Sequence, residues 1–171
     1  MMNQTEFVLP SASLIVTHES TTGDPGRFGD GIVIIDEDVH PDTITTIRVR
    51  CKCATQIIYW SWRPESWYFP LSILFVEETE TLFVGGGTLS AIVDVRTMRV
   101  IRKHKSLLFW SFQHTRNSVI ELGEVECFLF RRDGELVGSA DVDPPYEVIE
   151  HDSDVEFLSS IFGSQRITYP T

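Results

Sequence analysis

Short apolar runs separated by glycine or polar turns are the clearest pattern in this sequence, and they are best developed in the middle of the chain. Residues 82–84 (LFV) form one run, which three glycines at 85–87 bring to an end. A second run covers 89–95, and a polar break at Arg96-Thr97 precedes a third run, 98–101 (MRVI). Such runs, rich in β-branched residues and bounded by glycine, predict strands joined by tight turns, because glycine has no Cβ to obstruct a positive φ.

The same layout returns 36 positions further on. A polar turn containing Asp133-Gly134, a dipeptide typical of β-hairpins, stands where the break at Arg96-Thr97 stood. Two later runs, 146–149 and 155–158, predict strands of a third, incomplete copy. Self-similarity at a fixed period, built from several strands, predicts repeated small antiparallel sheets. The matching apolar pairs are 83–84 with 119–120, 92–93 with 128–129, and 100–101 with 136–137.

Two segments resemble a known architecture. LFVGGGTLSAIVDVRTMRVIRK and VIELGEVECFLFRRDGELVGSADVD are similar to blades of the β-propeller families, in which a strand and a glycine precede a V-x-D sequence, a turn and another strand. The resemblance covers residues 71–143 and carries over no functional residue. It implies strands arranged as blades. A complete propeller usually has at least four blades, whereas a chain of this length has room for two or three, so a partial propeller or curved sandwich is expected.

The first part of the chain also predicts strands. Runs at 14–16 and 56–62 are apolar, and the continuous run 31–35 (GIVII) is expected of a strand covered on both faces. Residues 44–53 alternate, which predicts a strand with one apolar and one basic face. The apolar face would carry Ile47, Val49, Cys51 and Cys53, and the basic face Arg48, Arg50 and Lys52.

Together these patterns predict an all-β fold: antiparallel sheets from about two and a half blade-like repeats, arranged as a partial propeller or curved sandwich, with little helix. One domain spanning residues 1–171 is expected for this length, with N-terminal strands in 1–70 and the blade-like repeats in 71–171. Residues 153–161 also fit a short capped helix, but their pattern favours a strand. The polar tail from Gly163 is expected to be loose.

Charge and cysteine content narrow the range of partners and compartments. The formal net charge is −11, with 25 Asp and Glu against 14 Lys and Arg. This balance opposes binding to nucleic acid or anionic membranes and leaves open a basic protein as partner. No apolar run approaches the roughly 18 residues that a membrane span requires. Three cysteines do not make a disulfide framework, and no secretory signal pattern is visible, so a cytoplasmic location is expected.

Residue patterns for cofactor or metal binding are incomplete. The stretch 85–88 (GGGT) lacks the lysine of a phosphate-binding P-loop and precedes a predicted strand rather than a helix. Cys51 and Cys53 share a strand face but lack two further soft ligands at a suitable spacing for zinc. The acidic stretch 147–154 lacks the spacing of an EF-hand calcium loop. We therefore expect neither a cofactor nor a metal, and the cysteines are interpreted as small apolar core residues.

Two groups of residues are candidates for partner binding. An aromatic cluster includes Trp60, Trp62 and Trp67, and alternation places Trp60 and Trp62 on one face of a strand. Exposed rings of this kind would anchor a protein or stack on a sugar. Their burial beneath the sheet is the favoured alternative, because large aromatics mostly pack in the cores of β proteins. The second group is acidic and lies in predicted turns: Asp36, Glu37, Asp38, Asp141 and Asp143.

Catalytic motifs are missing from the sequence, which contains neither G-x-S-x-G nor H-E-x-x-H. The leading hypothesis is a small protein-binding module without catalytic activity. In a narrower form it is a bacterial toxin-neutralising (immunity) protein, whose acidic surface covers the basic cleft of a nuclease-like toxin. The alternatives are a carbohydrate- or small-ligand-binding domain that uses the tryptophans, and an enzyme with a site assembled from distant loops. The oligomeric state stays open, because the sheet edges of an incomplete propeller invite pairing.

Overall fold

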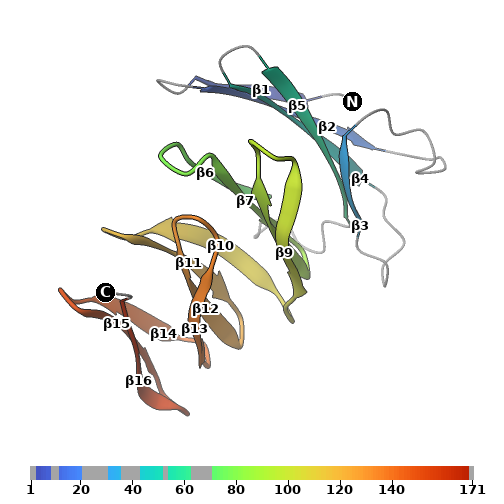
Figure 1. The fold of residues 1–171 in the computed structure, drawn as a ribbon. Helices are drawn as coiled ribbons and strands as arrows, with labels where there is room; N and C mark the ends of the chain where they lie inside the picture. The colour runs from blue at the N-terminus through green and yellow to red at the C-terminus, as the bar shows by residue number, and fades with distance from the viewer. Residues whose placement is uncertain are drawn as a thin grey trace.

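Strands and turns make up the structure, a computed structural model that describes residues 3–8, 12–20, 31–35, 43–51, 54–62 and 71–169. The described residues contain no helix, and their strands form four sheets. The prediction of an all-β fold built from antiparallel sheets is confirmed. The sheets follow one another in space in the order of the chain (Figure 1). No helix suited to crossing a bilayer occurs in the described part of the chain.

The N-terminal sheet has five strands in the order β1-β2-β4-β5-β3. Its neighbours are antiparallel, except that β3 runs parallel to β5. On β4 the predicted alternation is confirmed, because Ile47 and Val49 are fully buried while Arg50 is exposed. The prediction that 31–35 is covered on both faces is wrong for Val33, which is exposed on the edge strand β3. The strands are β1 (Asn3–Val8), β2 (Ala12–Ser20), β3 (Ile32–Ile35), β4 (Thr43–Cys51) and β5 (Ala54–Trp62).

The second and third sheets are four-stranded antiparallel meanders, in which each strand pairs with the next along the chain. The second sheet comprises β6 (Ser72–Val76), β7 (Thr81–Gly86), β8 (Leu89–Asp94) and β9 (Arg99–Lys105). The third comprises β10 (Phe109–His114), β11 (Ser118–Gly123), β12 (Glu126–Arg131) and β13 (Leu136–Asp141). The central strands of both are buried along most of their length, so they read in the sequence as continuous apolar runs.

The terminal sheet has three antiparallel strands, β14 (Tyr146–Glu150), β15 (Asp154–Ser159) and β16 (Gly163–Thr168). Residues 154–159 therefore form the favoured strand rather than the alternative helix. The expectation of a loose tail from Gly163 is wrong, because β16 pairs with β15 from end to end. The physical reason is Ile167, a single apolar residue in a polar segment, which is buried against Gly138 of β13.

Equivalent strands recur at a spacing one residue longer than the sequence pattern suggested. Each strand of the third sheet begins 37 positions after its counterpart in the second; β6 starts at Ser72, for example, and β10 at Phe109. The predicted offset of 36 is therefore wrong by one residue. A shift of one residue moves every side chain of a strand to its opposite face. The sequence did not reveal the slip, because strands covered on both faces are apolar at consecutive positions.

Among the described residues, three hydrophobic clusters lie between successive sheets and hold them face to face. The first joins the N-terminal and second sheets, and the third joins the third and terminal sheets through residues such as Leu129 and Phe157. The second cluster is mainly aromatic, and burial of each of its rings contributes about 1.5–3 kcal/mol. Its phenylalanines are Phe83 from the second sheet and Phe109, Phe112, Phe128 and Phe130 from the third.

Glycines act in two different ways in the second and third sheets. Gly87 and Gly134 have positive φ angles of 62° and 89°, which explains the turns predicted at both positions. Gly85 lies inside β7 instead, so the prediction that residues 85–87 all belong to a turn is wrong there. A Cβ at Gly85 would lie 2.4 Å from the ring of Phe109. Gly85 thus leaves the space that an aromatic ring of the next sheet fills.

Gly85→Ala is expected to destabilise the fold by about 1–3 kcal/mol, because the added methyl group overlaps a buried ring that has little room to move. Urea denaturation followed by tryptophan fluorescence measures the change. Gly163→Ala is the control, since its Cβ would meet no atom within 4 Å. In that variant only the strain of a positive φ lowers the free energy of unfolding, by about 1 kcal/mol. Equal losses in the two variants would contradict the steric explanation.

Candidate functional site

A cluster of three polar side chains interrupts the apolar interface between the second and third sheets. Ser90 on β8 and His104 on β9 face Glu121 on β11. The Ser90 hydroxyl donates to Oε2 of Glu121 at 3.0 Å and lies 2.9 Å from Nδ1 of His104. Nε2 of His104 is 3.3 Å from Oε1 of Glu121, which closes a triangle of contacts. We call these residues the Ser–His–Glu cluster.

Burial sets the charge state of the cluster. It raises the pKa of Glu121 to about 8, although the hydrogen bond from Ser90 and the Arg102 cation act in the opposite direction. Burial also lowers the pKa of His104 to about 4, and here Arg102 acts in the same direction. At neutral pH the carboxyl is therefore protonated and the imidazole neutral. A proton on Nδ1 can be donated to the hydroxyl of Ser90, whereas Nε2 lies 3.3 Å from Oε1 of Glu121 without forming a hydrogen bond to it.

The cluster has the residue types of a nucleophile, a base and an orienting carboxyl, but its geometry is closed. Ser90 and Glu121 are each 1% exposed. The ring of Phe128 covers the imidazole of His104 at a centroid distance of 4.4 Å. A substrate cannot reach the hydroxyl in this arrangement, so the contacts serve to join β8, β9 and β11. Glu121 stands 37 positions after Val84, the fully buried residue at the corresponding place in the second sheet.

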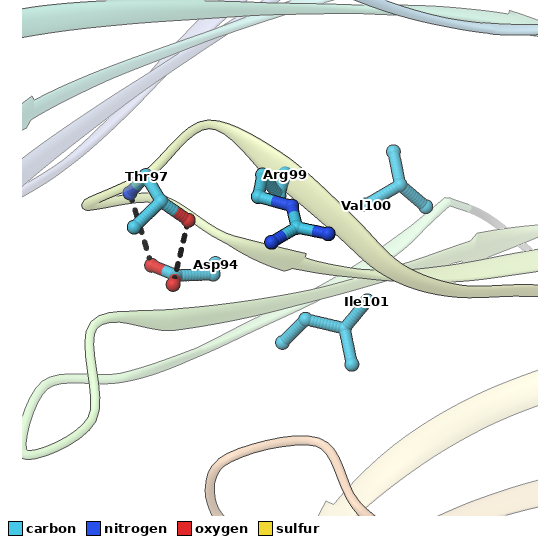
Figure 2. Close-up of a pocket in the computed structure, with 5 residues that line it drawn as sticks. All are labelled: Asp94, Thr97, Arg99, Val100 and Ile101. Carbon is cyan, nitrogen blue, oxygen red and sulfur yellow. Dashed lines mark hydrogen bonds between the residues drawn. The ribbon is translucent and has the colours of Figure 1, made fainter.

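A hollow of about 350 Å³ opens beside the β8–β9 hairpin (Figure 2). Thr97 donates to both oxygens of Asp94, from its hydroxyl at 2.7 Å and from its amide at 3.2 Å. Burial acts to raise the pKa of Asp94, but these hydrogen bonds hold it below its usual value. The rest of the lining consists of the guanidinium of Arg99 and the exposed side chains of Val100 and Ile101.

A second hollow, of about 500 Å³, lies between the β10–β11 and β14–β15 turns. It is lined by Arg116, Glu150, His151 and Asp152. The backbone amide of Arg116 donates to Glu150 at 2.9 Å, and its guanidinium pairs with Asp152 at 3.5 Å. His151 lies 3.0 Å from Glu156, so each residue of the lining already has a partner within the chain. Nowhere among the described residues do three or more potential metal ligands gather at one point.

The structure separates the tryptophans that were candidates for partner binding. Trp60 is fully buried in the first hydrophobic cluster, so its candidacy as a surface anchor is wrong and the favoured burial in the core applies to it. The reason is that its face of β5 packs against the second sheet. Trp62 is the last residue of β5. Trp67 lies outside the described residues, as do the acidic candidates Asp36, Glu37 and Asp38.

The acidic candidates Asp141 and Asp143 lie together where the third sheet meets the terminal sheet. Asp141 is the exposed last residue of β13, and its backbone exchanges hydrogen bonds with the side chain of Gln165 on β16. Asp143 follows it and accepts a hydrogen bond from Ser160 at 3.2 Å. The carboxylate of Asp143 thus lies beside the β15–β16 turn, where Ile161 is also exposed.

The structure describes two of the three cysteines, Cys51 and Cys127. Cys127 is fully buried and free, as expected of a small apolar core residue. Burial raises the pKa of its thiol. Cys51 ends β4, and Cys53 lies outside the described residues. The pairing of these two on one strand face therefore stays a prediction.

Sequence reasoning missed the Ser–His–Glu cluster because its members come from three strands and share no motif. The available signal was Glu121 within the apolar run 119–122 (VIEL). A carboxylate in a strand buried on both faces needs a partner, and only the fold shows that the partners are Ser90 and His104. Comparison of the sequence with known protein families gives no match, and comparison with curated proteins gives none either.

Glu121→Gln is expected to raise the free energy of unfolding at neutral and alkaline pH. The unfolded chain loses the Glu121 proton near the ordinary value of 4.5, whereas the folded chain keeps it up to about pH 8. Wild-type stability therefore falls as the pH rises through this window, by at most about 1.4 kcal/mol per unit. Gln cannot ionise and still accepts from Ser90. Its advantage should grow with pH in urea titrations across the window.

The matched control is Glu147→Gln, the same change at an exposed carboxylate. It should leave the dependence of stability on pH unchanged. Parallel pH curves for wild type and Glu121→Gln would contradict the protonated, buried state of Glu121.

Proposed function

We propose that this chain is a small protein-binding module without catalytic activity, which contacts a basic protein through an acidic surface on the terminal sheet. The proposal rests on one observation, a patch of exposed apolar side chains bordered by carboxylates. Ile161 is 71% exposed, Phe162 47% and Leu158 42%. Exposed apolar groups within a polar rim are typical of protein interfaces. We call these three residues, with Asp143 and Glu147, the terminal patch.

Local contacts hold the terminal patch in place. The hydrogen bond from Ser160 places Asp143 beside the β15–β16 turn. The amide of Phe162 donates to the hydroxyl of Ser159 at 3.2 Å, which fixes the turn from its other side. Glu147 stands opposite Leu158 in the β14–β15 ladder, so a carboxylate borders the apolar side chains on the strands as well. A surface held in this way loses little conformational freedom on binding.

Charge supports a basic partner. Residues 141–169 carry seven carboxylates against one arginine, a net charge of −6 out of −11 for the whole chain. A concentration of one sign attracts a cationic protein over a distance of about 10 Å at moderate salt and raises its rate of association. The residues are Asp141, Asp143, Glu147, Glu150, Asp152, Asp154 and Glu156, with Arg166 as the single cation.

In its narrower form the proposal is a toxin-neutralising protein, whose acidic terminal sheet occupies the basic substrate cleft of a nuclease-like toxin. The proposal includes the architecture that the sequence resemblance implies, with the second, third and terminal sheets as successive blades of a partial propeller. The common strand order and the recurrence of strand starts at 36 or 37 positions support it. The free, buried thiol of Cys127 fits a reducing, cytoplasmic setting.

A photo-reactive amino acid at position 162 tests the proposal in cells of the source organism. It should cross-link a basic protein, which is then purified for titration calorimetry. We expect one-to-one binding that weakens with salt, and Phe162→Asp should weaken it about 10- to 100-fold, the range typical of an interface anchor. A nuclease activity in the partner that is lost on titration with the chain would support the narrower form.

Leu107→Asp is the matched control, because Leu107 is also an exposed apolar residue, at 64%, but lies between β9 and β10. It should leave the affinity unchanged. Equal cross-linking from positions 107 and 162, or equal affinity of the two aspartate variants, would show that the terminal patch is not the contact surface.

A further inference from the structure

A second charged surface, opposite in sign to the terminal patch, lies on β9. Residues 96–105 contain five of the 14 lysines and arginines, although the chain as a whole is strongly acidic. β9 is the last strand of the second sheet, and the described strands pair it with β8 alone. Lysines and arginines on an edge strand often serve only to prevent aggregation. The surface at Arg99, Val100 and Ile101 has features that prevention of aggregation does not explain.

A β-bulge interrupts the pairing of β9 with β8 at the hollow. The pairing passes from Ile92↔Arg102 to Val93↔Val100, so Ile101 has no partner on β8. Neighbouring residues of a strand alternate between its two faces. Arg99, Val100 and Ile101 are all exposed, and Val100 and Ile101 project from opposite sides of the edge strand (Figure 2). Val100 is 40% exposed and Ile101 44%, which places two β-branched apolar groups in water directly beside an arginine.

The positive charge of Arg99 is uncommitted. Arg99 stands opposite Asp94 in the ladder, but both oxygens of Asp94 accept hydrogen bonds from Thr97 (Figure 2). Within the described part of the chain the side chain of Arg99 makes neither a hydrogen bond nor an ion pair. The hollow of about 350 Å³ therefore offers a free guanidinium next to an apolar wall.

We propose that this hollow is a second binding site, which takes an acidic segment of a protein partner in which a carboxylate side chain lies next to an aliphatic one. The carboxylate pairs with Arg99, whose planar guanidinium suits two parallel hydrogen bonds to it. The aliphatic side chain covers Ile101 and removes it from water, while Val100 projects from the other side of β9 (Figure 2). Other cations of β9 raise the local concentration of acidic segments. The chain then bridges two proteins, a basic one on the terminal patch and an acidic one on β9.

A fluorescent synthetic peptide in which glutamate alternates with isoleucine tests this site on the full chain by fluorescence polarisation. The proposal expects saturable binding, about tenfold weaker for Arg99→Glu. Arg131→Glu is the matched control, because it reverses the same charge at an exposed arginine of the third sheet and should leave the affinity unchanged. Thermal unfolding checks that each variant folds, and amide chemical shifts should move at residues 99–101 on binding.

Two further comparisons distinguish recognition of the aliphatic side chain from attraction between charges. A peptide in which glutamate alternates with serine should bind more weakly than the isoleucine peptide to wild type. The two peptides should bind equally to Ile101→Ser. Equal binding of both peptides to wild type, or equal weakening by Arg99→Glu and Arg131→Glu, would overturn the site in favour of a general electrostatic attraction. Light scattering that shows a dimer lost in both Arg99→Glu and Glu147→Lys would overturn it in favour of a second copy of this chain as the occupant.

Discussion

Burial of both faces of the second and third sheets is the constraint on which the rest of the structure depends. The rings of Phe83 and Phe130, from neighbouring sheets, are in contact at a centroid distance of 6.0 Å. Because Gly85 has no side chain, the ring of Phe109 can pack directly against its backbone. A sheet packed on one side only would leave its other apolar face in water. Each sheet therefore stabilises its neighbours. Apart from Glu121, the charged side chains of these two sheets lie in turns, at strand ends or on the edge strand β9.

The sequence predicts well where strands occur, but it predicts poorly which side chains lie on each face of a strand. Glycine at 87 and the Asp133-Gly134 turn mark strand ends that the structure confirms, because a turn with positive φ depends on local residues alone. The register of the repeat depends on which face a residue occupies. Consecutive apolar residues such as 119–120 leave that choice open until the neighbouring sheet is in place. β16 was not predicted for a related reason. Its buried apolar residue, Ile167, packs against Gly138, which belongs to another sheet.

The candidate sites depend still more on tertiary structure. Asp141 and Asp143 were found from local composition, whereas the contacts of Ser90 with Glu121 span 31 residues and follow no motif. The bulge that leaves Ile101 without a partner on β8 cannot be predicted from the residues of β9. A polar cluster in an aromatic interface also costs more to bury than an apolar one of similar volume. The retention of Glu121, where the preceding sheet has Val84, is a feature of this interface that hydrophobic packing alone does not require.

Charge of opposite sign is distributed along the stack of sheets. The basic strand β9 belongs to the second sheet and the acidic residues to the terminal sheet, with the third sheet between them (Figure 1). This separation places the attraction for acidic ligands and the attraction for basic ligands on different sheets. The local field of each surface orients an approaching charged protein before contact is made. Two ligands of opposite charge would thus be drawn to different sheets, with the third sheet between them.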